Sequence, residues 1–311
     1  MAPTVVLLGP QRWNPTLVTA FDELGLDGPV AAVTAGWQER EGEVEEMREH
    51  LGRPVVNLLL HQRGEKLFAA DRAFSALYRQ RQQRLRQLQE LYRLRLAPTL
   101  KAAREVLARQ GESELLEPER RAAVQALKAL DAHHLKRVCE VHEQFEAGAR
   151  PLERPALLRH RGELGKLLRP CVALAIAGGH VAVLLNRLRL FGVLELSGPR
   201  PIVAWSAGAM TLGSRVVLFH DHPPQGAGDA EVLESGLDVF DDLLPLPHAA
   251  KRLALDDPFR VSLFARRFAP QVPVALDPGA RLLRRGAGGW RPGRDTRRLT
   301  QRGEVALFPG P

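Results

Sequence analysis

The feature that most constrains the fold is an alternation of short apolar runs with helix-like segments, which a long stretch of purely helical periodicity interrupts. Apolar runs lie at Val5–Leu8, Val30–Val33 and Pro54–Leu60, and each is followed by a turn or a polar segment. This alternation is typical of βα units and a mostly parallel sheet. Because 54–60 is apolar almost throughout, we expect it to be a strand buried on both faces.

From residue 66 to 96 the apolar side chains instead recur at three- and four-residue steps, with arginines on the other face. This pattern predicts an amphipathic helix that continues past Pro98 and stops at Gly111. A second stripe begins near Pro118 and ends at Gly148, so we expect the two helices to pack as an antiparallel hairpin. A shorter third helix is expected over 152–168. The first stripe consists of Phe74, Leu77, Tyr78, Leu85, Leu88, Leu91 and Tyr92.

Strand-like runs resume at Cys171–Ala177 and Pro201–Ala204, and the chain ends in short strands with Gly-rich turns that predict antiparallel pairing. We therefore predict an α/β fold, a mostly parallel sheet flanked by helices and interrupted by an all-α helical insertion. The α/β domain is expected to consist of residues 1–64 and 169–311. The insertion is expected to span 65–168.

The positive charge of the chain is concentrated in one segment. The net charge of the 311 residues is +8, and between Lys66 and Arg109 eleven basic residues face three acidic ones, so this segment carries the whole excess. A basic helix face is usually solvated. The aromatic residues Phe74, Tyr78 and Tyr92 belong to the apolar stripe and leave no exposed ring for base stacking, so nucleic-acid binding is not favoured.

Cofactor, metal and export signals are weak or missing. Cys139 and Cys171 have no CxxC or Cys/His spacing, and His133, His134 and His142 form neither an i,i+4 pair nor an HExxH motif. No GxGxxG or P-loop occurs, so we expect no cofactor and no metal. The first residues lack the pattern of a signal peptide, and no apolar run is long enough to span a membrane. We expect a cytoplasmic protein without membrane contact.

The sequence Ala204-Trp205-Ser206-Ala207-Gly208 follows a predicted strand and opens a predicted helix. In this context, small-x-Ser-x-Gly forms a nucleophile elbow, in which the serine hydroxyl stands above the sheet on a sharp turn. Small residues two positions before and after the serine avoid collision with the neighbouring strand and helix. The helix N-terminus supplies backbone N–H groups for an oxyanion.

Four segments carry a resemblance to a known family: Ala175–His180 followed by Leu184-Leu185, Trp205–Ala209, Gly236-Leu237 through Leu243–His248, and Ala275–Ala280. In their order and separations they resemble the peptidase E and cyanophycinase group of serine hydrolases. That group is related in fold to the class I glutamine amidotransferases. An amidotransferase proper would need a cysteine at position 206.

The resemblance implies that Ser206 is the nucleophile and His248 the general base. It also implies an oxyanion hole made by the backbone N–H of Ala207 and by the Gly178-Gly179 turn. The chemistry agrees, because a serine hydroxyl needs an imidazole to take its proton, and the imidazole needs a carboxylate to orient it. Asp221 matches the peptidase E aspartate best by position, while Asp229 and Glu231 remain open.

The chain also departs from the family. Cyanophycinases carry Asp-Gln before the catalytic histidine, where this chain has Leu246-Pro247, and peptidase E has a proline there. His180 follows the glycine pair in place of the usual Asn, Asp or Gln. Arg252 and Arg260, downstream of His248, are the candidates for binding an acidic substrate group.

Two functions from different classes follow. The first is a serine hydrolase resembling peptidase E, which cleaves a small peptide or amide through an acyl-enzyme on Ser206. The second is a non-catalytic binding or scaffold protein whose basic insertion holds nucleic acid or an acidic partner. The insertion is equally suited to forming a homodimer or to covering the active site.

Overall fold

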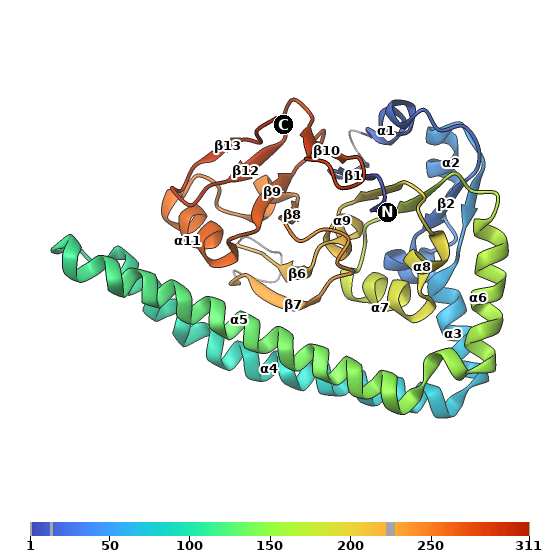
Figure 1. The fold of residues 1–311 in the computed structure, drawn as a ribbon, viewed down its shortest axis with the longest axis horizontal. Helices are drawn as coiled ribbons and strands as arrows, with labels where there is room; N and C mark the ends of the chain where they lie inside the picture. The colour runs from blue at the N-terminus through green and yellow to red at the C-terminus, as the bar shows by residue number, and fades with distance from the viewer. Residues whose placement is uncertain (1, 13–14, 222–227, 311) are drawn as a thin grey trace.

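The computed structural model describes residues 2–12, 15–221 and 228–310. Its centre is a seven-stranded sheet in the order β11-β10-β1-β5-β4-β2-β3, and the strands from β1 to β3 in this order run parallel (Figure 1). The strands are β1 (Val5–Leu8), β2 (Val30–Val33), β3 (Val55–Asn57), β4 (Ala173–Ile176), β5 (Ile202–Trp205), β10 (Arg281–Arg284) and β11 (Arg291–Pro292). The predicted α/β fold with a mostly parallel sheet is confirmed.

Helices cover both faces of this sheet. In β1, Val5 and Leu7 belong to one apolar core and Val6 and Leu8 to another, which explains why the run is apolar at every position. The flanking helices are α1 (Leu17–Leu24), η1 (Ala35–Arg40), α2 (Glu45–Leu51), α3 (Leu60–Ala70), α7 (Val181–Phe191), α8 (Val193–Ser197) and α9 (Ala207–Leu212).

The expectation of a two-sided buried strand over 54–60 is wrong. Only Val55–Asn57 is a strand, and it forms an edge of the sheet. Leu58 and Leu60 are fully buried, but they lie in the turn and the first position of α3, where they pack under the helix. A short apolar run does not by itself distinguish a strand from the buried start of a helix.

A second sheet has the order β13-β12-β9-β8 and adjoins a separate antiparallel pair, β6 with β7. Most of the chain's tail is antiparallel as predicted, but β9 pairs parallel with β8. The elements are β6 (Arg215–Leu218), β7 (Glu231–Ser235), β8 (Leu243–Pro247), α10 (Ala249–Arg252), α11 (Pro258–Phe268), β9 (Val272–Leu276), β12 (Arg297–Leu299) and β13 (Val305–Leu307).

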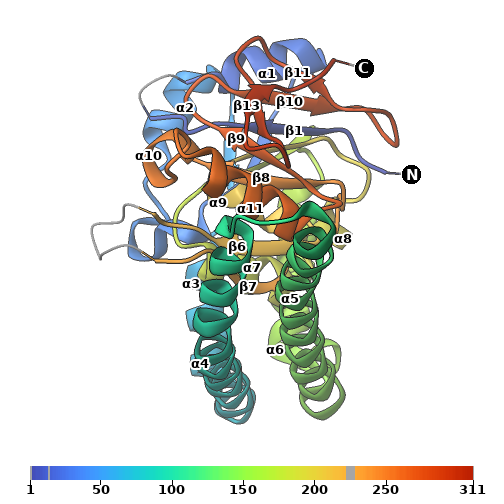
Figure 2. The same ribbon diagram turned by 90° about the vertical axis from the view of Figure 1, so that its left-hand side faces the viewer.

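Every element within 65–168 is helical. The two long helices α4 (Arg72–Ala108) and α5 (Ser113–Ala149) form the expected hairpin and lie side by side (Figure 2). They are followed by η2 (Pro151–Glu153) and α6 (Pro155–Leu168). Helix α5 begins five residues before Pro118, and not at it. Because Leu67, Phe145 and Leu164 share one core with the sheet, the base of the insertion is packed into the α/β domain. Its existence as a separate domain stays a prediction.

The apolar stripe of α4 is less regular than its spacing predicted. Leu91 is 58% exposed, whereas Arg81 is only 6% exposed and its guanidinium lies over the rings of Tyr78 and Phe145, at 4.3 and 4.4 Å. A straight helix drifts relative to a strict seven-residue repeat, so the buried face rotates along its length. An arginine can occupy a buried position when aromatic faces receive its charge.

A buried ionic network joins the α4–α5 hairpin to α11, the helix that packs on the second sheet. Arg267 of α11 donates from Nε to Asp131 Oδ2 and from Nη2 to Asp131 Oδ1, both at 2.8 Å, and Nη2 also donates to Tyr92 Oη at 2.8 Å. Tyr92 donates to Asp131 at 2.7 Å and accepts from Val232 N. Burial raises the pKa of Tyr92, which keeps the phenol a donor. The side chains of Arg267 and Asp131 are 2% and 1% exposed.

We expect Asp131→Ala to destabilise the protein by about 3–5 kcal/mol, because it leaves the Arg267 guanidinium buried without its carboxylate. Urea unfolding followed by circular dichroism measures the change. The control is Arg137→Ala, which removes an exposed pair with Glu140 and is expected to cost about 0–1 kcal/mol. A loss for Asp131→Ala as small as that of the control would contradict this role of the network.

Candidate active site

Ser206 stands at the turn between β5 and α9. Its backbone has φ 51° and ψ −125°, a conformation that non-glycine residues rarely adopt and that marks a strained turn. A Cβ on Gly208 would overlap the carbonyl oxygen of Ile176 in the neighbouring strand β4. The predicted sharp strand-to-helix turn is therefore present, and glycine is required two residues after the serine.

The Gly178-Gly179 turn follows β4 and lies directly against Ser206. A Cβ on Gly178 would lie 2.7 Å from Ser206 Cβ and 3.5 Å from its Oγ. Gly179 has φ 108°, and a Cβ there would overlap Gly36, whose carbonyl oxygen accepts from His180 N at 2.8 Å. No hydrogen bond from the amides of Gly178 or Gly179 occurs within the described residues.

Ala207 is the first residue of α9, so its amide has no acceptor within the helix. Backbone N–H groups of Ala207 and of the glycine turn are thus available near the hydroxyl of Ser206. This arrangement is the one expected of an oxyanion hole.

His248 follows β8 and begins α10 in a left-handed backbone conformation, φ 57° and ψ 36°. Its amide donates to Leu276 O at 3.2 Å, which holds the residue against the end of β9. Burial lowers the pKa of His248, the nearby charges of Arg252 and Lys251 lower it further, and Asp277 opposes them. The imidazole is therefore neutral near pH 7, as a general base requires.

The end of α9 lies at the start of β8. Gln271 Nε2 donates to both Ser214 Oγ and Leu243 O, so the chain that leaves α9 lies at the start of β8. Helix α9 and β8 also pack against each other. Within the described residues no hydrogen bond joins Ser206 to His248, and the triad stays a prediction.

Each of the three carboxylates expected as triad acids has other partners. Asp221 accepts from Ala254 N at 3.0 Å and pairs with Arg260. Asp229 pairs with Arg104 of α4. Glu231 accepts from Arg93 and Gln89 of the same helix at 2.7 and 3.0 Å. His222 and residues 223–227 of the adjoining loop lie outside the described residues.

Among the described residues, Asp277 is the acid whose charge acts on His248, and it was not predicted from the sequence as the triad acid. Strands β8 and β9 are parallel with Pro247 opposite Leu276, so His248 and Asp277 leave the same edge of the sheet. Asp277 accepts from Ala250 N at 2.9 Å and from Arg297 at 3.3 Å, and its charge acts to raise the pKa of His248. The signal was available, because both residues directly follow apolar runs and carboxyl ends of parallel strands meet.

The two candidate substrate-binding arginines differ. Arg260 is paired with Asp221. Arg252 lies one turn after His248, is half-buried, and its guanidinium has no hydrogen-bond or ion-pair partner within the described part of the chain. Burial lowers the pKa of Arg252. A desolvated arginine without a carboxylate partner is suited to receive an anionic ligand group.

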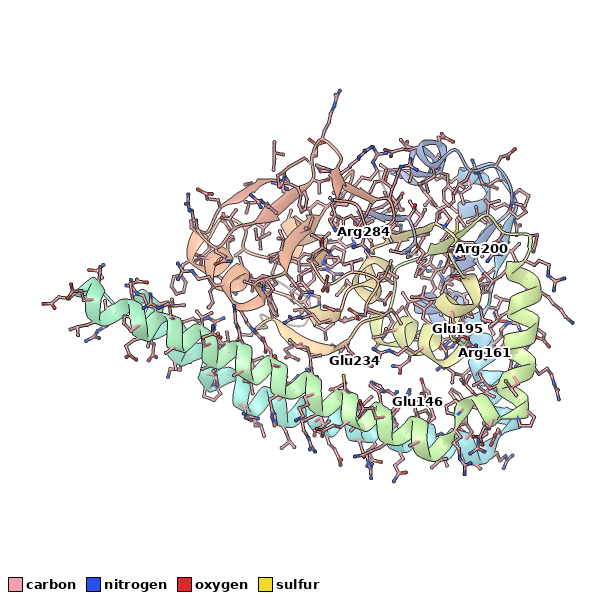
Figure 3. All side chains as sticks on the ribbon, viewed as in Figure 1. Glu146, Arg161, Glu195, Arg200, Glu234 and Arg284 are labelled. Atoms are coloured by element: carbon pink, nitrogen blue, oxygen red, sulfur yellow. The ribbon has the colours of Figure 1, made fainter. Side chains whose placement is uncertain are left out.

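Two histidines of the α4–α5 hairpin, His134 and His142, contact neighbouring side chains. His134 stacks on Tyr92 with ring centroids 4.2 Å apart, and His142 Nε2 lies 2.6 Å from a carboxylate oxygen of Glu234. Glu234 of β7 also binds Arg189, and its side chain faces the hairpin (Figure 3). Among the described residues no group of three or more His, Cys, Asp or Glu is placed to hold a metal ion. No helix there is both long and apolar enough to cross a bilayer.

The solved structures that resemble this chain include two described as peptidases. A peptidase from an acI-B1 Actinobacterium is 12% identical, with a TM-score of 0.47, over 99% of this chain and 98% of that one. A Listeria monocytogenes EGD-e protein, provisionally named peptidase E, is 13% identical with a TM-score of 0.44, over 96% and 99%. No family model and no curated protein matches.

Proposed function

We propose that this chain is a serine hydrolase that cleaves a small peptide or amide through an acyl-enzyme on Ser206, without a cofactor. The observation that carries the proposal is the strained backbone of Ser206, held directly against the Gly178-Gly179 turn. A strained serine at the carboxyl end of a central parallel strand, with unpaired amides beside it, is the arrangement that acyl transfer needs.

In the proposed reaction, His248 takes the proton from Ser206 Oγ as the oxygen attacks the substrate carbonyl. The amides of Ala207 and of the glycine turn donate to the oxyanion that forms. The C–N bond then breaks, and His248 returns the proton to the departing amine. Water, activated by the same imidazole, hydrolyses the ester on Ser206 and restores the enzyme.

We assign the orienting carboxylate to Asp277 rather than to Asp221. Asp277 leaves the sheet edge beside His248, and its charge acts to raise the pKa of His248. Asp221 is not among the charges that shift this pKa. Asp277 also fixes the first turn of α10 through Ala250 N, so it positions the backbone that carries the imidazole.

For the substrate, we propose that Arg252 binds a carboxylate. Its guanidinium is half-buried one turn from His248, so an anionic substrate group there would gain charge-assisted hydrogen bonds. We assign Arg260 to the ion pair with Asp221 and not to the substrate.

The scaffold alternative has less support. Arg93 and Arg104 of α4 are paired with Glu231 and Asp229, and Arg81 is buried against aromatic rings. Part of the insertion's positive charge is therefore used to dock the helix on its own protein. A basic partner-binding face would need that charge to be unpaired.

The nucleophile is tested with a fluorophosphonate probe, which labels activated serines. We expect the wild type to be labelled, Ser206→Ala to lose labelling, and the exposed Ser113→Ala to keep it. The rate should rise with pH as His248 loses its proton, with a midpoint below the ordinary value of 6.5, because burial lowers the pKa of His248. An unlabelled wild type, or labelling that survives Ser206→Ala, would overturn the proposal.

The orienting acid is tested by comparing Asp277→Asn with Asp221→Asn. We expect Asp277→Asn to slow labelling by about 10²-fold or more and to move the pH midpoint downward, because the lost charge acts to raise the pKa of His248. Asp221→Asn should leave the midpoint unchanged and lower only the unfolding midpoint. If Asp221→Asn slowed labelling and moved the pH midpoint while Asp277→Asn did not, Asp221 would be the acid.

The role of Arg252 is tested with Arg252→Gln and a pair of substrates, one bearing a side-chain carboxylate and one the corresponding amide. We expect the ratio of kcat/KM for the acid over the amide to fall by about tenfold or more, since a charge-assisted hydrogen bond is lost. Rates are compared above the histidine midpoint, where the protonation of His248 no longer limits them. An unchanged ratio would exclude Arg252 as the carboxylate ligand.

A further inference from the structure

A cavity of about 380 Å³ lies between α3 and α6, at the end of the molecule opposite the second sheet (Figure 1). One face of each helix lines it. From α3 come Gln62, Arg63 and Lys66, and from α6 come Arg159, His160 and Glu163, at three- and four-residue steps. None of these residues takes part in the reaction proposed for Ser206.

The cavity is strongly cationic. Arg63, Lys66 and Arg159 face a single carboxylate, Glu163. Arg63 binds Glu163 through Nη1, and its Nε donates to Leu58 O at 2.9 Å, which holds the guanidinium in place. The side chains of Lys66 and Arg159 have no hydrogen bond or ion pair to the described parts of the chain. Two of the positive charges that line the cavity are therefore unpaired within the described residues.

The surroundings of His160 show the same excess of positive charge. Its side chain is 14% exposed, and its Nδ1 lies 3.3 Å from Arg63 Nη1, which can only donate. Burial lowers the pKa of His160, the charges of Arg63, Lys66 and Arg159 lower it further, and Glu163 opposes them. The ring is therefore neutral, with Nδ1 accepting and Nε2 carrying a proton. The cavity is therefore lined by three kinds of hydrogen-bond donor, which are an ammonium, guanidinium groups and an imidazole N–H, and by few acceptors.

We propose that this cavity binds a small tetrahedral dianion, inorganic phosphate or a phosphate monoester. An anion there would neutralise Lys66 and Arg159 and would accept hydrogen bonds from the ammonium and the guanidinium fork. The volume exceeds what one phosphate group fills and lies in the range of small-molecule sites, so a monoester has room for its organic group.

The test is isothermal titration calorimetry of the full chain with inorganic phosphate, at an ionic strength held constant with chloride. The pocket variant is Lys66→Ala with Arg159→Ala. The control, Lys166→Ala with Arg169→Ala, removes the same charge from exposed positions near the end of α6 that do not line the cavity. Lys66, Arg159 and Lys166 are exposed helical positions, where alanine is favourable, and Arg169 is the exposed C-cap of α6.

We expect the wild type and the control to bind one phosphate with similar affinity, and the pocket variant to bind at least tenfold more weakly. Phosphate should also raise the thermal unfolding midpoint of the wild type and the control, but not that of the pocket variant. Absence of binding to the wild type overturns the proposal. An equal loss in the control and the pocket variant also overturns it, because it would mean that only net charge attracts the anion.

Discussion

Direct contact between backbone segments at the carboxyl edge of the parallel sheet is the constraint on which the candidate site depends. Gly36 lies against Gly179, Gly178 lies against the side chain of Ser206, and Gly208 lies against the carbonyl of Ile176. A methyl group at any of these glycines would overlap its neighbour or force it to move. The contacts bring the turns after β2, β4 and β5 together, and they leave amides pointing at no internal acceptor beside the serine. The strain at Ser206 is tolerated because these neighbours hold the turn from several sides.

The helical insertion is held to this framework by charge as well as by apolar packing. The Tyr92–Asp131–Arg267 network lies between the hairpin and α11, where each polar group has a partner, so the burial of two charges is compensated. Glu234 adds a second link through His142 and Arg189. Arg93 and Arg104 bind acids at the start of β7. These arginines of the insertion therefore form ion pairs where α4 packs on the rest of the protein. For this reason Asp229 and Glu231, two of the candidate triad acids, already have partners.

Much of the fold was readable from the sequence, and the failures have physical causes. The central strands and the hairpin were predicted, because apolar runs and helical periodicity are local patterns. The strand over 54–60 was too long, since buried helix starts and buried strands are equally apolar. Leu91 is exposed and Arg81 buried, because the face that α4 buries depends on what packs against it. Ser206 was placed on its turn correctly, whereas the acid beside His248 was sought in the loop after Phe219 and not at the end of β9.

The sequence by itself determined the local requirements of the site: a serine between small residues, a glycine pair after a buried strand, and a histidine after another. Each depends on backbone geometry within a few residues, so the residue types reveal it. Only the tertiary structure decided which carboxylate adjoins His248, that Arg260 is paired while Arg252 is not, and that cations of α3 and α6 converge on one cavity. These are contacts between elements that lie far apart in the chain. Their distances are set by how sheets and helices pack, and no local pattern of residues encodes them.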